Sequence, residues 1–499
     1  MHQSSSRRQF LHTALGGIAA ASIVVGFDVR RRSWLTAAAQ DAADRHGDPL
    51  PHLDGTLFVD AAHLDAAQDD FGHIVHERPV AVLLPGSVQD IVEMVRYARR
   101  HDLQVAMRGN GHSPFGQSQV EAGIVIDSSS LADVQLGSSG SSAWVDAGPG
   151  AHWRAVLQAA LAQGLTPPVL TDYQDLTVGG TLSVGGIGGT SQTFGVQADN
   201  VIELEVVTGE GERVVCSESL RSNLFNSVLA GLGQCALIVR ARVSLIAAPA
   251  QVTIFNLFYD DIEVYVSDQL RLLRQGRFEH LQGQVVANAA GTGWRFMIEA
   301  GAFFTPPESP NAAALLAGLH DVRADMTSLT ESYSDYVFRL DPTIAFLISI
   351  GVWGFPHPWI DLFVPASRAA SFVGGVVSSL TVADTGGGPI LFYPVDSRRM
   401  QRPFFRLPDE RYCFEFSILR TADPSVPSSV TDMLADNRAI YDQLVQIGGT
   451  RYGNGAIPFD RQDWRRHFGA QWPALAAAKR RFDPDRVLTP GQGIFPPRR

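Results

Sequence analysis

Apolar residues in the first part of the chain recur with two different periods, which predict short strands and a covering helix. Residues 80–84 form an apolar run of the length of a buried strand. We expect a helix to follow, capped by Ser87 and ending near Arg100, with an acid at its third position. Its apolar residues repeat at helical spacing, at Val88, Ile91, Val92 and Val95. Residues 103–107 return as a strand, so the pattern predicts a strand–helix–strand unit.

The pattern continues as short strands and changes after Pro249. Further strands are predicted at residues 124–127, 143–147, 201–208, 213–216 and 237–245. A Ser/Gly-rich turn at residues 137–142 separates the first two of them, and a helix of about ten residues is predicted from Trp153. Between Pro249 and about Gly449 the elements lengthen and the glycine-rich turns disappear. We therefore expect a separate domain there.

The longest glycine-rich stretch lies at residues 171–189 and reads T-D-Y-Q-D-L-T-V-G-G-T-L-S-V-G-G-I-G-G. Glycine lets the backbone approach a ligand closely, and N–H groups from successive turns form concave anion sites of the kind that hold a diphosphate. A set of tight sheet turns with solvated aspartates explains the same stretch. Both interpretations stay open on these residues alone.

A second stretch, V-A-M-R-G-N-G-H-S at residues 105–113, predicts a strand that ends in a flexible loop holding His112. No third glycine and no helical pattern follow at the offsets of a Rossmann dinucleotide motif. One loop thus carries an imidazole and the other carries carboxylates. This combination suggests a cofactor with a phosphate middle and a reactive end.

Composition narrows the class of protein. A chain of 499 residues suits two large domains, and 45% hydrophobic with 18% charged residues is typical of an ordered soluble protein. The net charge of −11 argues against nucleic acid as a partner, because phosphates would be repelled. Three widely spaced cysteines form neither a metal knuckle nor a disulfide framework, and no metal site is predicted.

The N-terminus has the pattern of an export signal. Residues 6–11, S-R-R-Q-F-L, match the twin-arginine pattern, and a mild apolar run at residues 11–27 is short for a membrane span. Residues 37–39, A-A-A, offer a cleavage site. We interpret residues 1–39 as a twin-arginine signal peptide, with an uncleaved anchor as the alternative. The expected location is periplasmic or extracellular, without stable membrane insertion.

The two glycine-rich stretches resemble the flavin domain of the vanillyl-alcohol oxidase and p-cresol methylhydroxylase superfamily, and within it cytokinin dehydrogenase. The family's G-R-G-H-S loop appears at residues 109–113, and its T-D-Y-x-x-L-T-V-G-G-T-L-S motif appears without a gap at residues 171–183. Further matches are N-V-x-E-L-E-V-V-T-G (200–209), L-F-x-x-V-L-x-G-L-G-Q (224–234), P-H-P-W (356–359), G-P-I-L-F-Y-P (388–394), H-F-G (467–469) and F-D-P-x-x-x-L-x-P-G-Q-x-I-F (482–495). They follow the family's order over roughly residues 55–496.

This resemblance implies an α+β fold of two domains. An FAD-binding domain would comprise residues 40–248 and the returning residues 451–499, with an α+β substrate domain, or cap, inserted at residues 249–450. FAD would be bound covalently through His112, with no second link because no cysteine lies near residues 171–189. The other implied FAD contacts are Met107, Gly109, Asn110, Gly111, Ser113, Gln117, Asp172, Thr177, Gly180, Ser183, Ile187, Ile238 and Gln492.

Asp172, the aspartate of T-D-Y, is the implied catalytic residue. Oxidation of an amine by hydride transfer leaves a cationic iminium, so a carboxylate at the nitrogen accepts its proton or stabilises the charge. The implied substrate is a cytokinin, an N6-substituted adenine of the isopentenyladenine type, bound by Asp172 and Gln282 and cleaved to adenine and an aldehyde. A quinone or O₂ would accept the electrons. Asp175 is interpreted as structural, and a turn or helix cap is the alternative role for Asp172.

Three departures from the family bear on the substrate. Asn110 replaces the arginine of G-R-G-H-S, and Gln282 replaces a carboxylate that would contact the purine. The family's F-R-H-G-P run is absent, because residues 192–196 read Q-T-F-G-V. A flavin oxidase of another alcohol, sugar, phenol or amine is therefore the alternative enzyme, and a flavin-carrying protein that binds a ligand without turnover is the alternative of a different class.

Overall fold

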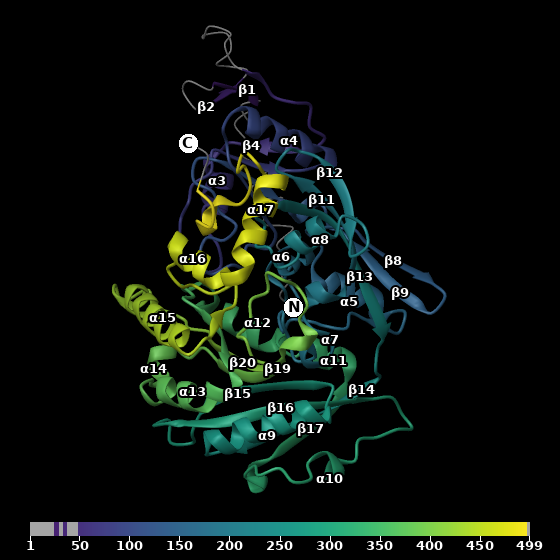
Figure 1. Cartoon of the computed structure of the whole chain (residues 1–499), viewed down its shortest axis with the longest axis vertical. Coiled ribbons are helices and arrows are strands. Elements are labelled where there is room, and N and C mark those ends of the chain that lie inside the picture. The colour runs from purple at the N-terminus through teal and green to yellow at the C-terminus, as the bar shows by residue number, and fades with distance from the viewer. Residues whose placement is uncertain (1–23, 29–32, 37–47, 497–499) are drawn as a thin grey trace, which may run out of the picture.

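The computed structural model describes residues 24–28, 33–36 and 48–496. The chain forms two parts that lie one above the other along its longest axis (Figure 1). The upper part joins the purple to blue strands of the first half of the chain with the yellow C-terminal helices, and we call it the flavin part. The lower part is built around the green strands of the middle of the chain, and we call it the cap.

The predicted strand–helix–strand unit is present in a four-stranded sheet of order β4-β5-β7-β6, in which β5, β7 and β6 are parallel. Its strands are β4 (Thr56–Phe58), β5 (Ala81–Leu84), β6 (Val105–Arg108) and β7 (Ile124–Asp127). Helix α4 (Val88–Arg100) packs its apolar stripe into the core of this sheet, and α3 (Ala61–Ala67) contacts β5.

Helix α4 begins where the sequence predicts, but the predicted serine cap is wrong. The Ser87 hydroxyl donates to the carboxylate of Asp54 at 2.8 Å and does not cap the helix. The buried carboxylate of Asp90 accepts instead from the backbone N–H groups of Gly86, Asp54 and Gly55, at 2.7 to 2.8 Å. The acid of the first turn therefore joins the loop before the helix to the segment that precedes β4.

A second sheet of the flavin part has the order β12-β11-β13-β9-β8, with β10 paired to β13. Its strands are β8 (Val134–Ser139), β9 (Ser142–Ala147), β10 (Leu165–Thr166), β11 (Val201–Thr208), β12 (Arg213–Ser217) and β13 (Ala236–Ala247). Helices α5 (Trp153–Leu161), α6 (Val178–Val184), α7 (Ser191–Phe194) and α8 (Ser222–Val228) belong to this part. The predicted turn at residues 137–142 is present but shorter, because residues up to Ser139 extend β8, which pairs with β9 across a turn at Gly140.

The cap is an eight-stranded sheet of order β17-β14-β16-β15-β19-β20-β18-β21, in which neighbouring strands run antiparallel. Its strands are β14 (Gln251–Tyr259), β15 (His280–Ala287), β16 (Trp294–Phe304), β17 (Thr327–Ser332), β18 (Ile360–Pro365), β19 (Ile390–Asp396), β20 (Tyr412–Ile418) and β21 (Thr450–Arg451). Helices α9 (Ile262–Gln275), α13 (Ala369–Ser378) and α15 (Ser429–Gln446) share a core with one face of this sheet. The opposite face shares a core with the flavin part.

The shorter helices of the cap are α10 (Ala312–Leu315), α11 (Tyr333–Val337), α12 (Asp341–Ser349) and α14 (Val382–Thr385). The C-terminal helices α16 (Arg461–Phe468) and α17 (Trp472–Phe482) return to the flavin part. The tail after them runs parallel to β6, with a bridge between Val105 and Leu488. The flavin part is therefore assembled from both ends of the described chain, as Figure 1 shows.

Part of the predicted signal segment is described as β-structure. Strands β1 (Val24–Asp28) and β2 (Ser33–Thr36) form a small sheet with β3 (Asp48–Pro49). The twin-arginine pattern at residues 6–11 and the cleavage site at residues 37–39 lie outside the described residues. Among the residues that the structure describes, no helix has the length and apolar character of a membrane span, and no cluster of three or more acidic, histidine or cysteine side chains could hold a metal ion.

Candidate active site

The loop that carries His112 is fastened by a buried carboxylate. Asp70, which is 3% exposed, accepts from the Ser113 hydroxyl at 2.9 Å and from the N–H groups of Gly116 and Gly72 at 2.7 and 3.1 Å. Burial raises the pKa of Asp70 to about 6. Sequence reasoning missed this residue, because an isolated aspartate carries no motif. Its three acceptor contacts set the position of the loop from which His112 projects.

His112 lies in an aromatic environment. The ring centroids nearest to it are 3.9, 4.9, 5.7 and 5.6 Å away, in Phe71, Tyr173, Trp353 and Trp359. Burial, with a smaller contribution from His357, lowers the pKa of His112 to about 3. The imidazole is therefore neutral at ordinary pH, and one ring nitrogen keeps a lone pair for a bond or a hydrogen bond.

The two glycine-rich stretches meet at the start of helix α6. The helix begins after Thr177, whose hydroxyl accepts a first-turn N–H, so the stretch is not simply a set of sheet turns. A Cβ on Gly109 would lie only 2.0 Å from that hydroxyl. Gly185 and Gly186 adopt φ values of 127° and 76°, and the Gly186 N–H donates to the Tyr452 hydroxyl at 3.1 Å. The backbone at Gly109 and Gly186 thus lies close against the side chains of Thr177 and Tyr452, and this glycine-lined crossing fits the diphosphate of FAD.

The other predicted FAD contacts lie on β6, on the histidine loop, on helix α6, in the core shared with the cap and in the C-terminal segment. Met107, Asn110, Gly111 and Ser113 lie on β6 or the histidine loop, and Gly180 and Ser183 lie on α6. The Gln117 amide donates to the Asn454 carbonyl at 2.9 Å, which ties the loop to the C-terminal segment. Ile187 and Ile238 are 8% and 2% exposed and belong to the core shared with the cap. The Gln492 carbonyl accepts from the Trp464 indole at 2.8 Å.

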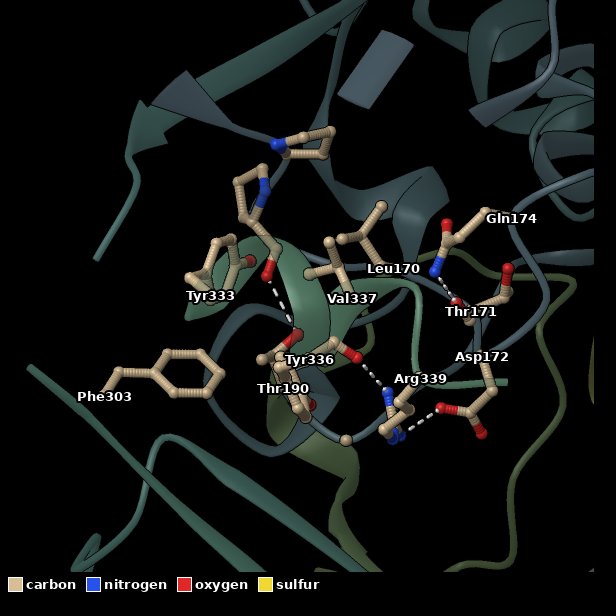
Figure 2. A pocket seen from close by; sticks show the side chains of 13 residues that line it. Leu170, Thr171, Asp172, Gln174, Thr190, Phe303, Tyr333, Tyr336, Val337 and Arg339 are labelled. Carbon is tan, nitrogen blue, oxygen red and sulfur yellow. Dashed lines mark hydrogen bonds and ion pairs between the residues drawn. The ribbon is translucent and has the colours of Figure 1, made fainter. Parts of the chain in front are cut away.

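Asp172 is held from the cap by two side chains. One carboxylate oxygen accepts from the guanidinium of Arg339 at 2.8 Å, and the other accepts from the amide of Gln282 at 3.0 Å. Figure 2 shows the Arg339 contact beside the pocket. Gln282 comes from β15, and Arg339 follows helix α11. The predicted catalytic and substrate-binding residues are therefore brought together across the two parts, while Arg339 was missed by sequence reasoning.

Arg339 continues into a charged network within the cap. Its guanidinium lies 3.5 Å from the carboxylate of Glu299, which is 3.0 Å from Nε2 of His280. The Tyr336 hydroxyl lies 2.5 Å from Nδ1 of the same imidazole. Burial acts to raise the pKa of Glu299, but His280 and Arg339 together hold it down at about 2. The network therefore keeps a carboxylate on each side of Arg339 and fixes the direction of its guanidinium.

The pocket beside this network is lined by aromatic and proline residues together with polar groups of the glycine-rich stretch (Figure 2). Its aromatic residues are Phe303, Tyr333 and Tyr336. Asp175 does not line the pocket; it accepts from Arg154 at 2.6 Å, and Arg154 also donates to Asp341 at 2.7 Å. This arrangement agrees with a structural role for Asp175, because it joins the flavin part to helix α12 of the cap.

Known structures share this architecture. The structure of 6-hydroxy-D-nicotine oxidase from Arthrobacter nicotinovorans matches with a TM-score of 0.68 and 20% identity, over 88% of this chain and 97% of that chain. The VAO-type flavoprotein MtVAO615 from Myceliophthora thermophila matches with a TM-score of 0.66 and 18% identity, over 86% and 85%. The fold is that of a VAO-type flavoprotein with an FAD domain and a cap, which confirms the expected fold class.

Sequence comparison identifies the family. The family model "FAD binding domain" matches residues 79–217, and "Cytokinin dehydrogenase 1, FAD and cytokinin binding" matches residues 293–495. Cytokinin dehydrogenase 1 of Oryza sativa subsp. japonica is 34% identical over 90% of this chain and 94% of its own length. An "Uncharacterized oxidoreductase ORF5 in fasciation locus" of Rhodococcoides fascians is 40% identical over 88% and 99%. The chain belongs to the cytokinin dehydrogenase family of FAD-dependent oxidoreductases.

Replacing Arg339 by methionine should impair catalysis without loss of FAD. Asp172 would lose one of its two partners and would face the like charge of Glu299, so its carboxylate would leave its present direction. Misplacement of a reacting group by about 1 Å costs roughly 100-fold in rate, which is the loss we expect in the rate of flavin reduction by stopped-flow absorbance. Arg323→Met, an exposed arginine of the same region, is the control and should keep the wild-type rate. A wild-type rate in Arg339→Met would contradict the positioning role.

Proposed function

We propose that this protein oxidises a secondary amine with FAD and that its substrate is a cytokinin whose N6 side chain is cleaved to adenine and an aldehyde. The observation that carries the proposal is the carboxylate of Asp172, which the cap holds with two hydrogen bonds. The neighbouring Tyr173 contacts the ring of His112 at 4.9 Å between centroids. A fixed carboxylate beside the flavin site is the group that oxidation at a CH–NH bond requires.

In this proposal Asp172 binds the N–H of the substrate and takes its proton as positive charge develops on the nitrogen. Arg339 and Gln282 orient the carboxylate, so little reorganisation is needed at the moment of reaction. The rings of Trp353, Trp359 and Phe71 exclude water from the His112 side of the site. FAD, when bound, supplies the two-electron oxidation by accepting a hydride from the carbon next to the nitrogen. The resulting imine is hydrolysed, and a quinone or O₂ removes the electrons.

One observation keeps a second candidate open within the same chemistry. The Gln282 amide, which stands where we predicted a purine contact, also lies 3.4 Å from Arg339 and is committed to Asp172. Because an amide has two N–H donors and one acceptor oxygen, a Gln282 that already bonds Asp172 and Arg339 has fewer hydrogen bonds left to offer a purine ring nitrogen. An FAD-dependent oxidase of another amine, alcohol or sugar is therefore the alternative.

Anaerobic addition of N6-isopentenyladenine should bleach the flavin absorbance of the purified protein. Asp172→Asn should slow the bleaching by about 100-fold or more, because general base catalysis is worth roughly 10²–10⁴ in rate. Asp175→Asn, three residues away in an ion pair with Arg154, is the matched control and should bleach nearly as fast as the wild type. If the flavin is not bleached by this amine but is bleached by another amine or an alcohol, the second candidate function is favoured and the cytokinin proposal is rejected.

We further propose that FAD is bonded covalently to His112, which a neutral imidazole favours because its ring nitrogen keeps a lone pair. Acid-precipitated wild-type protein should then keep its yellow colour in the pellet. His112→Ala should release all flavin to the supernatant, whereas His63→Ala, which changes an exposed histidine, should not. Free flavin in the wild-type supernatant would show that the link is absent.

The pattern at residues 6–11 supports export by the twin-arginine route to the periplasm or beyond, in a folded state that already holds FAD. Changing Arg7 and Arg8 to lysine should leave the flavoprotein in the cytoplasmic fraction, as measured by flavin absorbance after fractionation. Equal export of the wild type and this variant would exclude the route.

A further inference from the structure

The cap carries a second pair of acidic side chains on its inner face. Phe363, Tyr393 and Cys413 belong to the core shared with the flavin part, whereas the residues beside them in β18, β19 and β20 pack against the outer helices. Successive side chains of a strand point to opposite faces. Asp361 and Glu415 are each two residues from one of these inward residues, so they also face the flavin part.

The strand register brings the two acids close to each other and to the site of Asp172. Glu415 is paired with Tyr393 on β19 and with Phe363 on β18, and Asp361 is paired with Ser417. The two acids are therefore diagonal neighbours on adjacent strands, roughly 7–8 Å apart. β20, the strand of Glu415, is two strands away from β15, the strand of Gln282. The distance across the sheet between these two strands is roughly 10 Å. The charge of Asp172 also contributes to the raised pKa of Glu415.

Both acids are buried and incompletely satisfied. Glu415 and Asp361 are 3% and 5% exposed. The Ser417 hydroxyl donates to Oε1 of Glu415 at 3.1 Å, but Oε2 of Glu415 and Oδ2 of Asp361 have no hydrogen-bond partner within the described part of the chain. Burying a polar atom without a partner is unfavourable, so two such atoms on one inner face indicate a site that a ligand completes.

The two carboxyl groups differ in protonation, so together they offer one donor and one acceptor. Burial raises the pKa of Glu415 to about 8; the Tyr393 and Ser417 hydroxyls oppose this rise, and the charge of Asp361 adds to it. Burial raises the pKa of Asp361 only to about 6, because Ser417 and the positive charge of Arg451 oppose it. At neutral pH Glu415 is mainly a carboxylic acid that can donate, while Asp361 is mainly a carboxylate that can accept.

We propose that Asp361 and Glu415 form a second binding subsite, which takes the edge of a nitrogen heterocycle that presents one ring N–H and one ring nitrogen acceptor. Asp361 accepts from the ring N–H, and Glu415 donates to the neighbouring ring nitrogen. The subsite rests on the proposed function, in which Asp172 binds the exocyclic nitrogen of the same ring system. Its residues lie on the cap sheet, across the inner face from Gln282.

Binding of adenine and 9-methyladenine to the FAD-loaded enzyme, measured by calorimetry, tests this subsite. Neither compound carries an N6 side chain, so binding is read without turnover, and 9-methyladenine lacks the ring N–H. The wild type should bind adenine at least tenfold more tightly than 9-methyladenine. Asp361→Asn should weaken adenine binding at least tenfold and lose most of the preference, because a neutral amide is a weaker acceptor than a carboxylate. Glu415→Leu should weaken the binding of both compounds at least tenfold and keep the preference, because both present the ring nitrogen to which Glu415 donates. Asp268→Asn, a buried acid of helix α9 on the outer side of the sheet, should keep the wild-type preference.

A wild type without the preference, or an Asp361→Asn protein that retains it, would overturn the subsite. Asp361→Asn changes almost no volume, so it provides the decisive variant if Glu415→Leu does not fold. The outcome is independent of the proposed oxidation. A preference for adenine that depends on Asp361, in a protein that N6-isopentenyladenine does not bleach, would keep the subsite and reject the proposed function.

Discussion

The ion pair between Arg339 and Asp172 is the contact on which the geometry of the site depends. It joins the glycine-rich stretch of the flavin part to the cap, and Gln282 on β15 donates to the second carboxylate oxygen. Arg339 itself lies 3.5 Å from the carboxylate of Glu299, so the direction of the Asp172 carboxylate is set by residues far apart in the sequence. The proposed base therefore takes its orientation only when the cap is docked on the flavin part.

The flavin side of the site is also held by specific contacts. Asp70 holds the histidine loop, and the absence of a side chain at Gly109 lets this loop meet Thr177 at the start of helix α6. Gly186, which follows that helix, donates its N–H to the Tyr452 hydroxyl. The apolar surroundings of His112 keep its imidazole neutral. A charged ring could not use its lone pair toward a carbon, so the aromatic packing and the proposed covalent chemistry depend on each other.

The sequence predicted the local features well, because strands, the first helix and the two glycine-rich loops are encoded in residues close together in the chain. It located Asp172 through a contiguous motif. It could not predict Arg339, which lies 167 positions from its partner, or Glu299, which is an isolated acid on a strand. Their pairing is decided by strand register and by the docking of the cap, which no local pattern records. The serine cap failed for the same reason, since the Ser87 hydroxyl has a distant partner.

The coupling between Asp172 and Arg339 is the most direct test of this account, and a double-mutant cycle on the rate of flavin reduction measures it. Asp172→Asn, Arg339→Met and the double variant are compared with the wild type, using whichever amine or alcohol the enzyme oxidises fastest. If Arg339 acts through Asp172, its replacement costs little once the carboxylate is gone, and the two losses are strongly non-additive. Two losses that simply multiply would contradict the account, because Arg339 would then act on the reaction independently of Asp172.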